Sequence, residues 1–325
     1  MNNIKSVAVT SDLKTIVYYS NFQLLKCSAP DYRVSLKIAT SFGFHQLLFS
    51  HCEKYLYGAV CWSKKAIMKF SASNLAKLDE TCEHMHYITN ILIYPDRPIL
   101  VSSSFDGVMK FWSLTTSLKY SVLSAKLSSS GITSIVSNPE EKSLIFSSSK
   151  GTLSISSIEN LKLKCKVKLN ETIFILQIDQ ARRSVLVGSD NYVIECRSDN
   201  LAILQKFGIF QDVSAFWLKK LRGFSVFVGA MSGLEIKAMS NLPLKKLKFV
   251  DQGFNVLKIE SQSNKEILLL TEGDLAFGQF ELKNECFLVK IGRFRRRASR
   301  MLWRRRKDGG EATVSFRSKF LIQSK

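Results

Sequence analysis

The fold prediction starts from the stretch SSSFDGVMKFWSL, residues 102–114. Small polar residues give way to Asp106-Gly107, and an alternating run then ends in Phe111-Trp112. Aspartate followed by glycine favours a tight hairpin turn, because glycine tolerates positive φ angles, and strict alternation is typical of a half-buried strand. The stretch therefore predicts two antiparallel strands joined by a short turn.

The same order of signals recurs with a period of about 40 residues, and each unit contains four strand signals. The second strand of a unit is the most apolar, as expected of a strand that is covered on both faces. This pattern is typical of a β-propeller, so we predict one all-β domain of seven blades over residues 1–292. The blades are expected at about 4–40, 44–82, 86–127, 131–169, 172–208, 212–250 and 253–292.

The fourth strands tend to alternate lysine with apolar residues, most clearly in LKLKCKVKL at 161–169. Lysine on an outer edge strand discourages pairing between molecules. Much of the positive charge of the predicted propeller is explained in this way without any ligand.

The third unit resembles the WD40-repeat family. His84 precedes Ile88 by four residues, where that family has its Gly-His histidine. The set that follows resembles the family's buried, hydrogen-bonded residues, although Ser113 replaces the usual aspartate and the other units have lost nearly all of these positions. The resemblance implies a divergent WD40-like propeller that serves as an interaction platform. It also implies a structural role for a set of four residues, His84, Ser102 (or Ser104), Asp106 and Trp112.

Composition places the chain among globular proteins. It has 325 residues, of which 46% are hydrophobic, and this is enough to bury a large core. No apolar run approaches the roughly 20 residues of a membrane span, and the N-terminus shows no signal-peptide pattern. Seven cysteines without a CxxC pair favour free thiols. We expect an intracellular protein, with the nucleus or nucleolus favoured over the cytoplasm and no membrane partner.

The sequence shows no catalytic pattern. It has no GxSxG, no GxxxxGK[ST] and no GxGxxG between a strand and a helix. The stretch Cys82-Glu83-His84-Met85-His86 lacks the paired cysteines of a zinc site. We therefore expect no enzyme activity, no metal, no cofactor and no small-molecule substrate.

Residues 293–325 hold 12 Lys+Arg against Asp308 and Glu311, a net charge of +10. This is half of the net charge of +20 of the whole chain. In a helix, the apolar residues between Phe294 and Leu302 would fall on one face, so we expect an extension that is partly helical or disordered. Such a segment attracts polyanions. The candidate RNA- or polyanion-binding residues are Arg293, Arg295, Arg296, Arg297, Arg300, Trp303, Arg304, Arg305, Arg306 and Lys307.

Arginine pairs with phosphate in a bidentate manner and tryptophan stacks on bases, so RNA is the first ligand considered for this tail. The chain would then be a non-catalytic scaffold of a large ribonucleoprotein, of the ribosome-biogenesis type, with the propeller binding protein partners. The alternative is a protein-only scaffold, cytoskeletal, ciliary or nuclear-pore-like, whose tail docks on an acidic protein surface. A nuclear-import signal is also open.

Two further motifs lie in the tail. Phe294-Arg295-Arg296 is similar to the Phe-Arg-Arg-Gly motif of phosphoinositide-binding propellers, although Arg297 replaces the glycine, and this gives a third candidate function. Arg296-Arg297-Ala298-Ser299 fits the pattern of basophilic kinases, so Ser299 is a candidate phosphosite. A phosphate there would weaken polyanion binding.

A propeller face usually binds peptides near the loops that enter its blades. Aromatic residues in or beside such loops are candidates for that role, with core packing as an equal alternative. They are Phe42, Phe44, Tyr87, Phe210 and Trp217.

Overall fold

The computed structural model describes residues 4–12, 14–28, 33–60, 64–189 and 192–207, and beyond these a series of strands between 218 and 317. Contacts divide the chain into two compact units. The larger unit comprises Lys5–Ala29 and Val34–Val213, and the smaller one comprises Met1–Ile4, Pro30–Arg33 and Ser214–Lys325. Each unit is described separately below.

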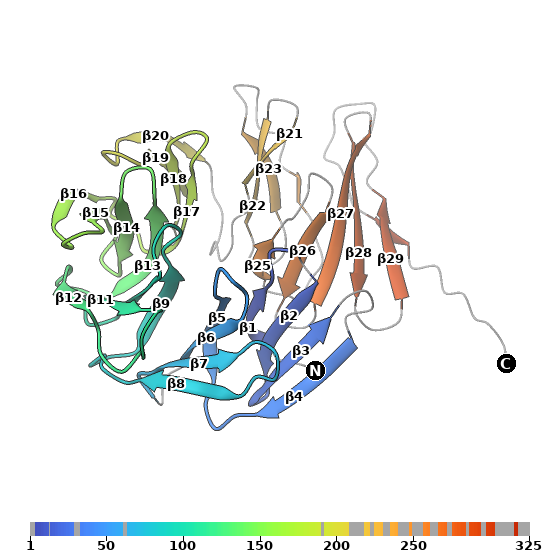
Figure 1. Cartoon of the computed structure of the whole chain (residues 1–325). Helices are drawn as coiled ribbons and strands as arrows, with labels where there is room; N and C mark the ends of the chain where they lie inside the picture. The colour runs from blue at the N-terminus through green and yellow to red at the C-terminus, as the bar shows by residue number, and fades with distance from the viewer. Residues whose placement is uncertain are drawn as a thin grey trace. The chain divides into compact units, whose positions relative to one another are not determined.

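The larger unit contains five four-stranded sheets (Figure 1). The first two sheets consist of β1 (Ile4–Val9), β2 (Thr15–Ser20), β3 (Gln23–Ser28), β4 (Arg33–Ala39), β5 (Phe44–Phe49), β6 (Tyr55–Val60), β7 (Ile67–Ser71) and β8 (Lys77–Thr81). The next two consist of β9 (Ile88–Ile93), β10 (Ile99–Ser104), β11 (Val108–Ser113), β12 (Leu123–Lys126), β13 (Ile132–Asn138), β14 (Ser143–Ser148), β15 (Thr152–Ser157) and β16 (Leu163–Lys168). The fifth consists of β17 (Ile173–Asp179), β18 (Ser184–Ser189), β19 (Val193–Arg197) and β20 (Ile203–Phe207).

Each sheet is an antiparallel meander in which strand order follows chain order. In the third sheet, for example, Val101 of β10 lies opposite Leu92 of β9 and Phe111 of β11. The first strands of neighbouring sheets contact one another, as β9 does with β13 and β13 with β17. The prediction of an all-β fold built from four-stranded units is confirmed, while the closure of seven blades into a ring stays a prediction.

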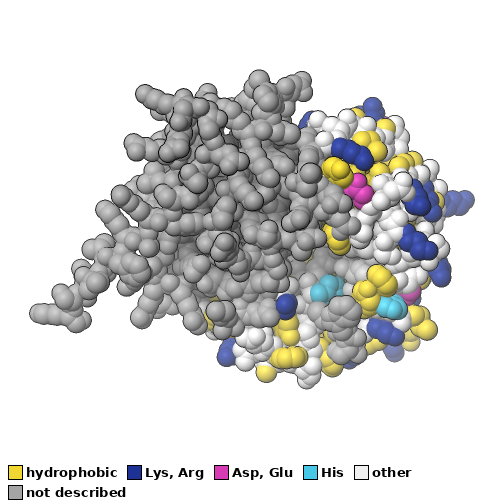
Figure 2. All heavy atoms as spheres, turned by 180° about the vertical axis from the view of Figure 1, so that it is seen from behind, with side chains coloured by type: hydrophobic (Ala, Val, Ile, Leu, Met, Phe, Trp, Pro, Cys, Tyr) yellow, Lys and Arg dark blue, Asp and Glu magenta, His cyan; other side chains and the backbone are white. Residues whose placement is uncertain are grey.

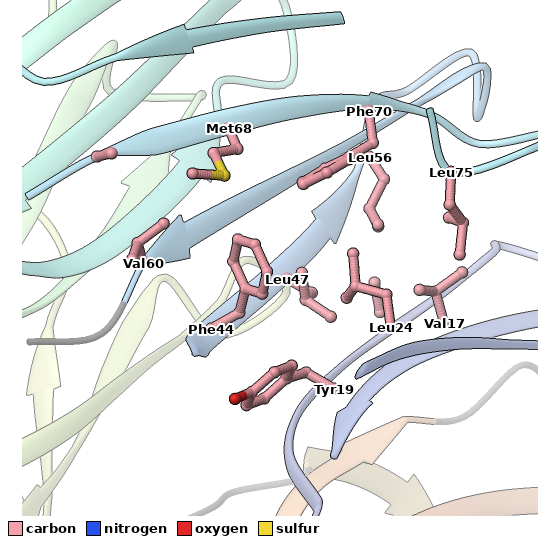
Figure 3. Close-up of a cluster of buried hydrophobic side chains, with 12 residues drawn as sticks. Val17, Tyr19, Leu24, Phe44, Leu47, Leu56, Val60, Met68, Phe70 and Leu75 are labelled. Carbon is pink, nitrogen blue, oxygen red and sulfur yellow. The ribbon is translucent and has the colours of Figure 1, made fainter. Parts of the chain in front are cut away.

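The five sheets are held together by apolar side chains packed between each sheet and the next. The second strands β14 and β18 are buried along their whole length, as expected of strands with a sheet on either side. Between the first two sheets, Phe44 packs edge-on against Tyr19 and Phe70, with ring centroids 5.7 Å apart in each pair (Figure 3). Gly58 leaves room for this ring, because a Cβ there would lie 2.6 Å from Phe44.

The ends of the second strands carry buried serines that bond to the first strand of the same sheet. Thr89 Oγ1 lies 3.0 Å from Ser103 Oγ, and Thr133 Oγ1 lies 2.8 Å from Ser147 Oγ at the equivalent place in the next sheet. These pairs satisfy hydroxyl groups that would otherwise be costly to bury.

In the smaller unit the structure describes strand backbones that form one four-stranded and one six-stranded sheet. The four-stranded sheet contains β21 (Leu218–Leu221), β22 (Phe224–Gly229), β23 (Glu235–Met239) and β24 (Leu247–Lys248). The six-stranded sheet contains β25 (Val256–Glu260), β26 (Glu266–Thr271), β27 (Leu275–Lys283), β28 (Cys286–Arg293), β29 (Arg297–Leu302) and β30 (Ser315–Arg317).

The helix considered for the basic tail is wrong for Arg297–Leu302, which form strand β29. This strand pairs with β28 from Arg293↔Arg297 to Val289↔Met301. A helical pattern reflects the segment alone, whereas the open edge of β28 offers backbone partners that an isolated segment lacks. Among the described residues, no helix has the length and apolarity needed to cross a membrane.

Candidate functional site

A pocket of about 310 Å³ opens among the first strands of the second to fifth sheets. It takes one strand residue each from β5, β13 and β17, and the rest from the start of β9 and the turn after β10. Because neighbouring first strands lie side by side, residues that are far apart in the sequence converge here. The lining residues are His45, Tyr87, Ile88, Thr89, Phe105, Thr133 and Phe174.

Aromatic rings form one wall of this pocket. Tyr87 and Phe105 are stacked, with centroids 4.8 Å apart and planes inclined by 21°. The ring of His86 lies 4.6 Å from Tyr87 and 5.5 Å from Phe105. We call the lining pair Tyr87 and Phe105 the aromatic wall; His86 contacts both rings but is not among the lining residues. Its members come from two separate loops, so it is a property of the folded sheet and not of one segment.

Local backbone contacts hold Phe105 in place. Its N–H donates to the carbonyl oxygen of Tyr87 over 3.1 Å, which ties the two loops together. Gly131 makes space for the ring, because a Cβ there would lie within 3 Å of three of its atoms. Phe105 is nevertheless 37% exposed and Phe174 44%. Exposed apolar side chains around a hollow are typical of a surface that binds another molecule.

His45 is one of the residues that line the pocket. Burial lowers its pKa to about 4, an effect that backbone groups of Thr89 and Ala59 partly oppose. Its Nε2 is buried and has no hydrogen-bond partner among the described residues. A neutral imidazole among apolar side chains can orient a ligand through one hydrogen bond. Figure 2 shows histidine side chains beside hydrophobic ones on one face of the described part.

The structure brings three of the four residues in the WD40-like set together. Trp112 Nε1 donates to Ser102 Oγ over 2.8 Å, and His84 Nε2 lies 2.6 Å from the same oxygen. All three side chains are buried. Ser102 thus joins the loop before β9 to strand β11, which is a structural role within one sheet.

Asp106 contributes to this set through the turn. Its Oδ1 accepts the N–H of Val108 over 2.8 Å, and its charge favours protonation of His84. Burial is the larger effect and lowers the pKa of His84 to about 4. His84 Nδ1 is buried without a hydrogen-bond partner among the described residues. His84 is therefore neutral near pH 7.

This pKa shift predicts an effect of acid on stability. The pKa of His84 is lower in the folded state than the usual value of 6.5, so its contribution is complete above pH 6.5 and lost as the pH falls toward 4. Between pH 7 and pH 5, His84→Asn is expected to lose about 2 kcal/mol less unfolding free energy than the wild type. Urea denaturation at both pH values measures this. The control His86→Asn, at an exposed site, is expected to follow the wild type, and equal losses in all three proteins would refute the assignment.

The Cys82–His86 stretch does not gather its side chains around one point. Cys82 donates to Glu80, Glu83 pairs with Lys110 over 3.0 Å, and His84 turns inward. Among the described residues, no group of three His, Cys, Asp or Glu side chains is arranged to hold a metal ion. The stretch instead contacts the third sheet, through Glu83 to Lys110 of β11 and through His84 to Ser102 of β10.

The structure separates the loop aromatics that the sequence proposed as candidates. Tyr87 lines the pocket, whereas Phe44 is fully buried in the core. Phe42 lies under the ammonium group of Lys64, 5.0 Å from its ring centroid. The other two candidates, Phe210 and Trp217, lie outside the described residues.

Of the tail candidates, Arg293 ends β28, and Arg297, Ser299 and Arg300 belong to β29, where Ser299 lies opposite Ile291. The remaining tail candidates are outside the described residues: Arg295, Arg296, Trp303, Arg304, Arg305, Arg306 and Lys307. Their role in binding a polyanion stays a prediction, as does phosphorylation of Ser299.

With this geometry established, comparison with known proteins defines the class of fold as a WD40-like β-propeller. No family model matches the sequence, and no curated protein does. Solved structures match in large number. One is a chain in the "Crystal Structure of Mitotic Checkpoint Complex", with a TM-score of 0.71 and 13% sequence identity, covering 85% of this chain and 86% of that one. At this identity the likeness establishes the fold alone.

Proposed function

We propose that the chain is a non-catalytic scaffold subunit that binds other proteins within a large assembly. The pocket beside the aromatic wall carries this proposal. Its volume of about 310 Å³ lies near the lower end of the range for ligand sites and suits one or two side chains of a peptide. Aromatic residues dominate the energetics of protein interfaces, because rigid rings bury much area at little entropic cost. The similar chain in a multi-protein complex supports the same proposal.

The polar groups of the pocket indicate how a peptide would be oriented. Thr89 and Thr133 are already bonded to serines of their own sheets, whereas Nε2 of His45 has no hydrogen-bond partner among the described residues. A side chain with an apolar body and a hydrogen-bonding tip would pack on the rings and bond to His45.

The double variant Tyr87→Ala/Phe105→Ala tests this proposal in the full-length protein. We expect it to lose the protein partners that the wild type retains in affinity purification followed by mass spectrometry, because truncation removes the stacked pair. Tyr120→Ala is the matched control, since Tyr120 is 69% exposed and lies outside the pocket. Retention of the same partners by a double variant that is folded by circular dichroism would exclude the pocket as the docking site.

We further propose that the assembly is a ribonucleoprotein of the nucleus or nucleolus and that the basic tail contacts RNA. The support is the tail's charge, 12 Lys+Arg against two acidic residues in 293–325. Phosphate contacts by such a segment would make the assembly sensitive to both RNase and salt.

Purification with and without RNase tests the RNA contact. Because β29 pairs with β28, truncation at 292 would remove part of the last sheet, so the variant Arg304→Gln/Arg305→Gln/Arg306→Gln/Lys307→Gln is preferable. Both treatments are expected to release ribosomal or nucleolar proteins. Survival of the same partners after both would favour the protein-only scaffold, and binding to anionic liposomes would favour the phosphoinositide alternative.

A further inference from the structure

The outer edge of the fourth sheet has a distinctive arrangement of charge. Strand β16 is the last in the order β13-β14-β15-β16 and pairs with β15, from Thr152↔Lys168 to Ser156↔Leu163. Within the described part of the chain no strand pairs with its other edge. The N–H and C=O groups of that edge are therefore available to a further strand.

Lysines project from β16 at every second position. Lys164, Lys166 and Lys168 are exposed, as is Lys162 just before the strand. We call the three strand residues the lysine ladder. Alternate residues of a regular strand are about 6.8 Å apart. The regular register runs from Lys168 to Cys165 and shifts between Cys165 and Leu163, so Lys164 lies at the irregularity. None of its members forms an ion pair with another described residue, and Lys164 Nζ donates only to the carbonyl oxygen of Glu141, over 3.4 Å.

Packing on the opposite face of β16 fixes the direction of the ladder. Cys165 and Val167 pack against the apolar cluster between the fourth and fifth sheets. Cys165 Sγ also donates to the carbonyl oxygen of Asn200 over 3.3 Å. Since neighbouring side chains point to opposite faces, the lysines cannot turn inward without exposing this core.

The other outer strands of the larger unit lack such a ladder. In β8, Lys77 pairs with Glu80 of the same strand, and in β20, Lys206 lies 4.0 Å from Glu171. Strand β12 carries a single lysine, Lys126, and β4 has basic residues only at Arg33 and Lys37. Protection against edge pairing is needed on every outer strand, so it does not by itself explain three unpaired lysines on one.

We propose that β16 is a docking strand for an extended acidic peptide segment of a partner protein, which adds to the sheet as a fifth strand. An added strand has the residue spacing of the regular part of β16, so acidic residues at alternate positions would meet Lys166 and Lys168, and the next one would approach Lys164 beside the register shift. The open backbone edge favours a peptide over RNA, because a nucleic acid cannot complete the backbone ladder. Like charge keeps a second copy of β16 away, which makes the same edge selective. This surface is distinct from the pocket.

A synthetic peptide of about twelve residues that alternates glutamate and threonine is the probe, with full-length protein and fluorescence anisotropy. An exposed ion pair strengthens binding by a factor of about 2 to 5, so Lys164→Thr/Lys166→Thr/Lys168→Thr is expected to weaken binding at least about tenfold. The control Lys65→Thr/Lys119→Thr/Lys126→Thr removes equal charge from exposed sites outside the fourth sheet and is expected to change binding less than about threefold. The pocket variant Tyr87→Ala/Phe105→Ala is expected to bind the peptide as the wild type does.

Two N-methylated peptides test strand addition on the unaltered protein. In a strand, alternate amides point to the same edge, so methylation of one alternate set is expected to abolish binding while methylation of the other set leaves it intact. Equal effects of the two sets would overturn the proposal, as would equal loss in the two triple-lysine variants. Tighter binding of a single-stranded oligonucleotide that depends on the same lysines would also overturn it in favour of RNA.

Discussion

Replacement of Trp112 with alanine is expected to lower the free energy of unfolding by about 3 to 5 kcal/mol, the range for large-to-small changes of a buried aromatic residue. Trp112 is fully buried between the second and third sheets and packs with Tyr57 and Leu100. Its removal leaves a cavity and also takes away the donor to Ser102 Oγ. Urea denaturation followed by circular dichroism measures the change.

Two variants separate the parts of this effect. Trp112→Phe keeps most of the volume but loses the hydrogen bond, and its expected cost is about 1 to 2 kcal/mol. Tyr120→Ala, at an exposed aromatic residue, is expected to change stability by less than about 0.5 kcal/mol. A cost below about 1.5 kcal/mol for Trp112→Ala would mean that the second and third sheets do not pack as described.

Substitution of alanine at Gly107 is expected to cost about 2 to 4 kcal/mol, because left-handed backbone strain and a clash with backbone act together. The φ angle of Gly107 is +82°, and a Cβ there would collide with the carbonyl oxygen of Ser128. The carbonyl oxygen of Gly107 also accepts N–H groups of Leu127 and Ser128, over 2.9 and 3.3 Å. The turn therefore cannot move away without breaking the loop that follows β12.

Gly43→Ala is the matched control for this prediction. A Cβ at Gly43 would lie 3.1 Å from the hydroxyl oxygen of Tyr19, which is the far end of a side chain. We expect a cost below about 1 kcal/mol, since such a group can move by a few tenths of an ångström. Equal thermal melting temperatures for the two variants would show that the Gly107 turn is not under this constraint.

The sequence allowed the larger unit to be predicted well because its signals are local. A turn such as Asp106-Gly107 and the alternation around it lie within a few residues of each other, and the structure places β10 and β11 on either side of that turn. The apolar second strands were recognisable for the same reason. The approach of His84 to Ser102 and Trp112 followed from the family resemblance, since 18 residues separate His84 from Ser102.

The pocket was not predictable in this way. His45, Phe105, Thr133 and Phe174 come from four different sheets, and no sequence pattern marks which residues of a first strand face the opening. The sequence does not distinguish exposed phenylalanines such as Phe105 and Phe174 from phenylalanines of the core. Of the three proposed loop aromatics that the structure describes, Tyr87 lines the pocket and Phe42 and Phe44 do not.

The lysine ladder was predictable only in part. Alternation in residues 161–169 predicted an outer strand with lysines, and the structure has β16 there. The sequence pattern does not show which lysines of the outer strands form ion pairs, because partners such as Lys206 and Glu171 are far apart in the sequence. In the tail, the local pattern predicted a helix, whereas the structure pairs β29 with β28. No local pattern reveals that pairing.

The order of strands within the sheets also bears on how the protein is made. The first strands of the five sheets begin at Ile4, Phe44, Ile88, Ile132 and Ile173, so each sheet comes from one short, continuous part of the chain. During synthesis a sheet can pair as soon as its own segment has left the ribosome, whereas its outward apolar face waits for the next sheet to cover it. The nascent chain is therefore most exposed to aggregation in the intervals between successive sheets, and slower translation there would lengthen that exposure.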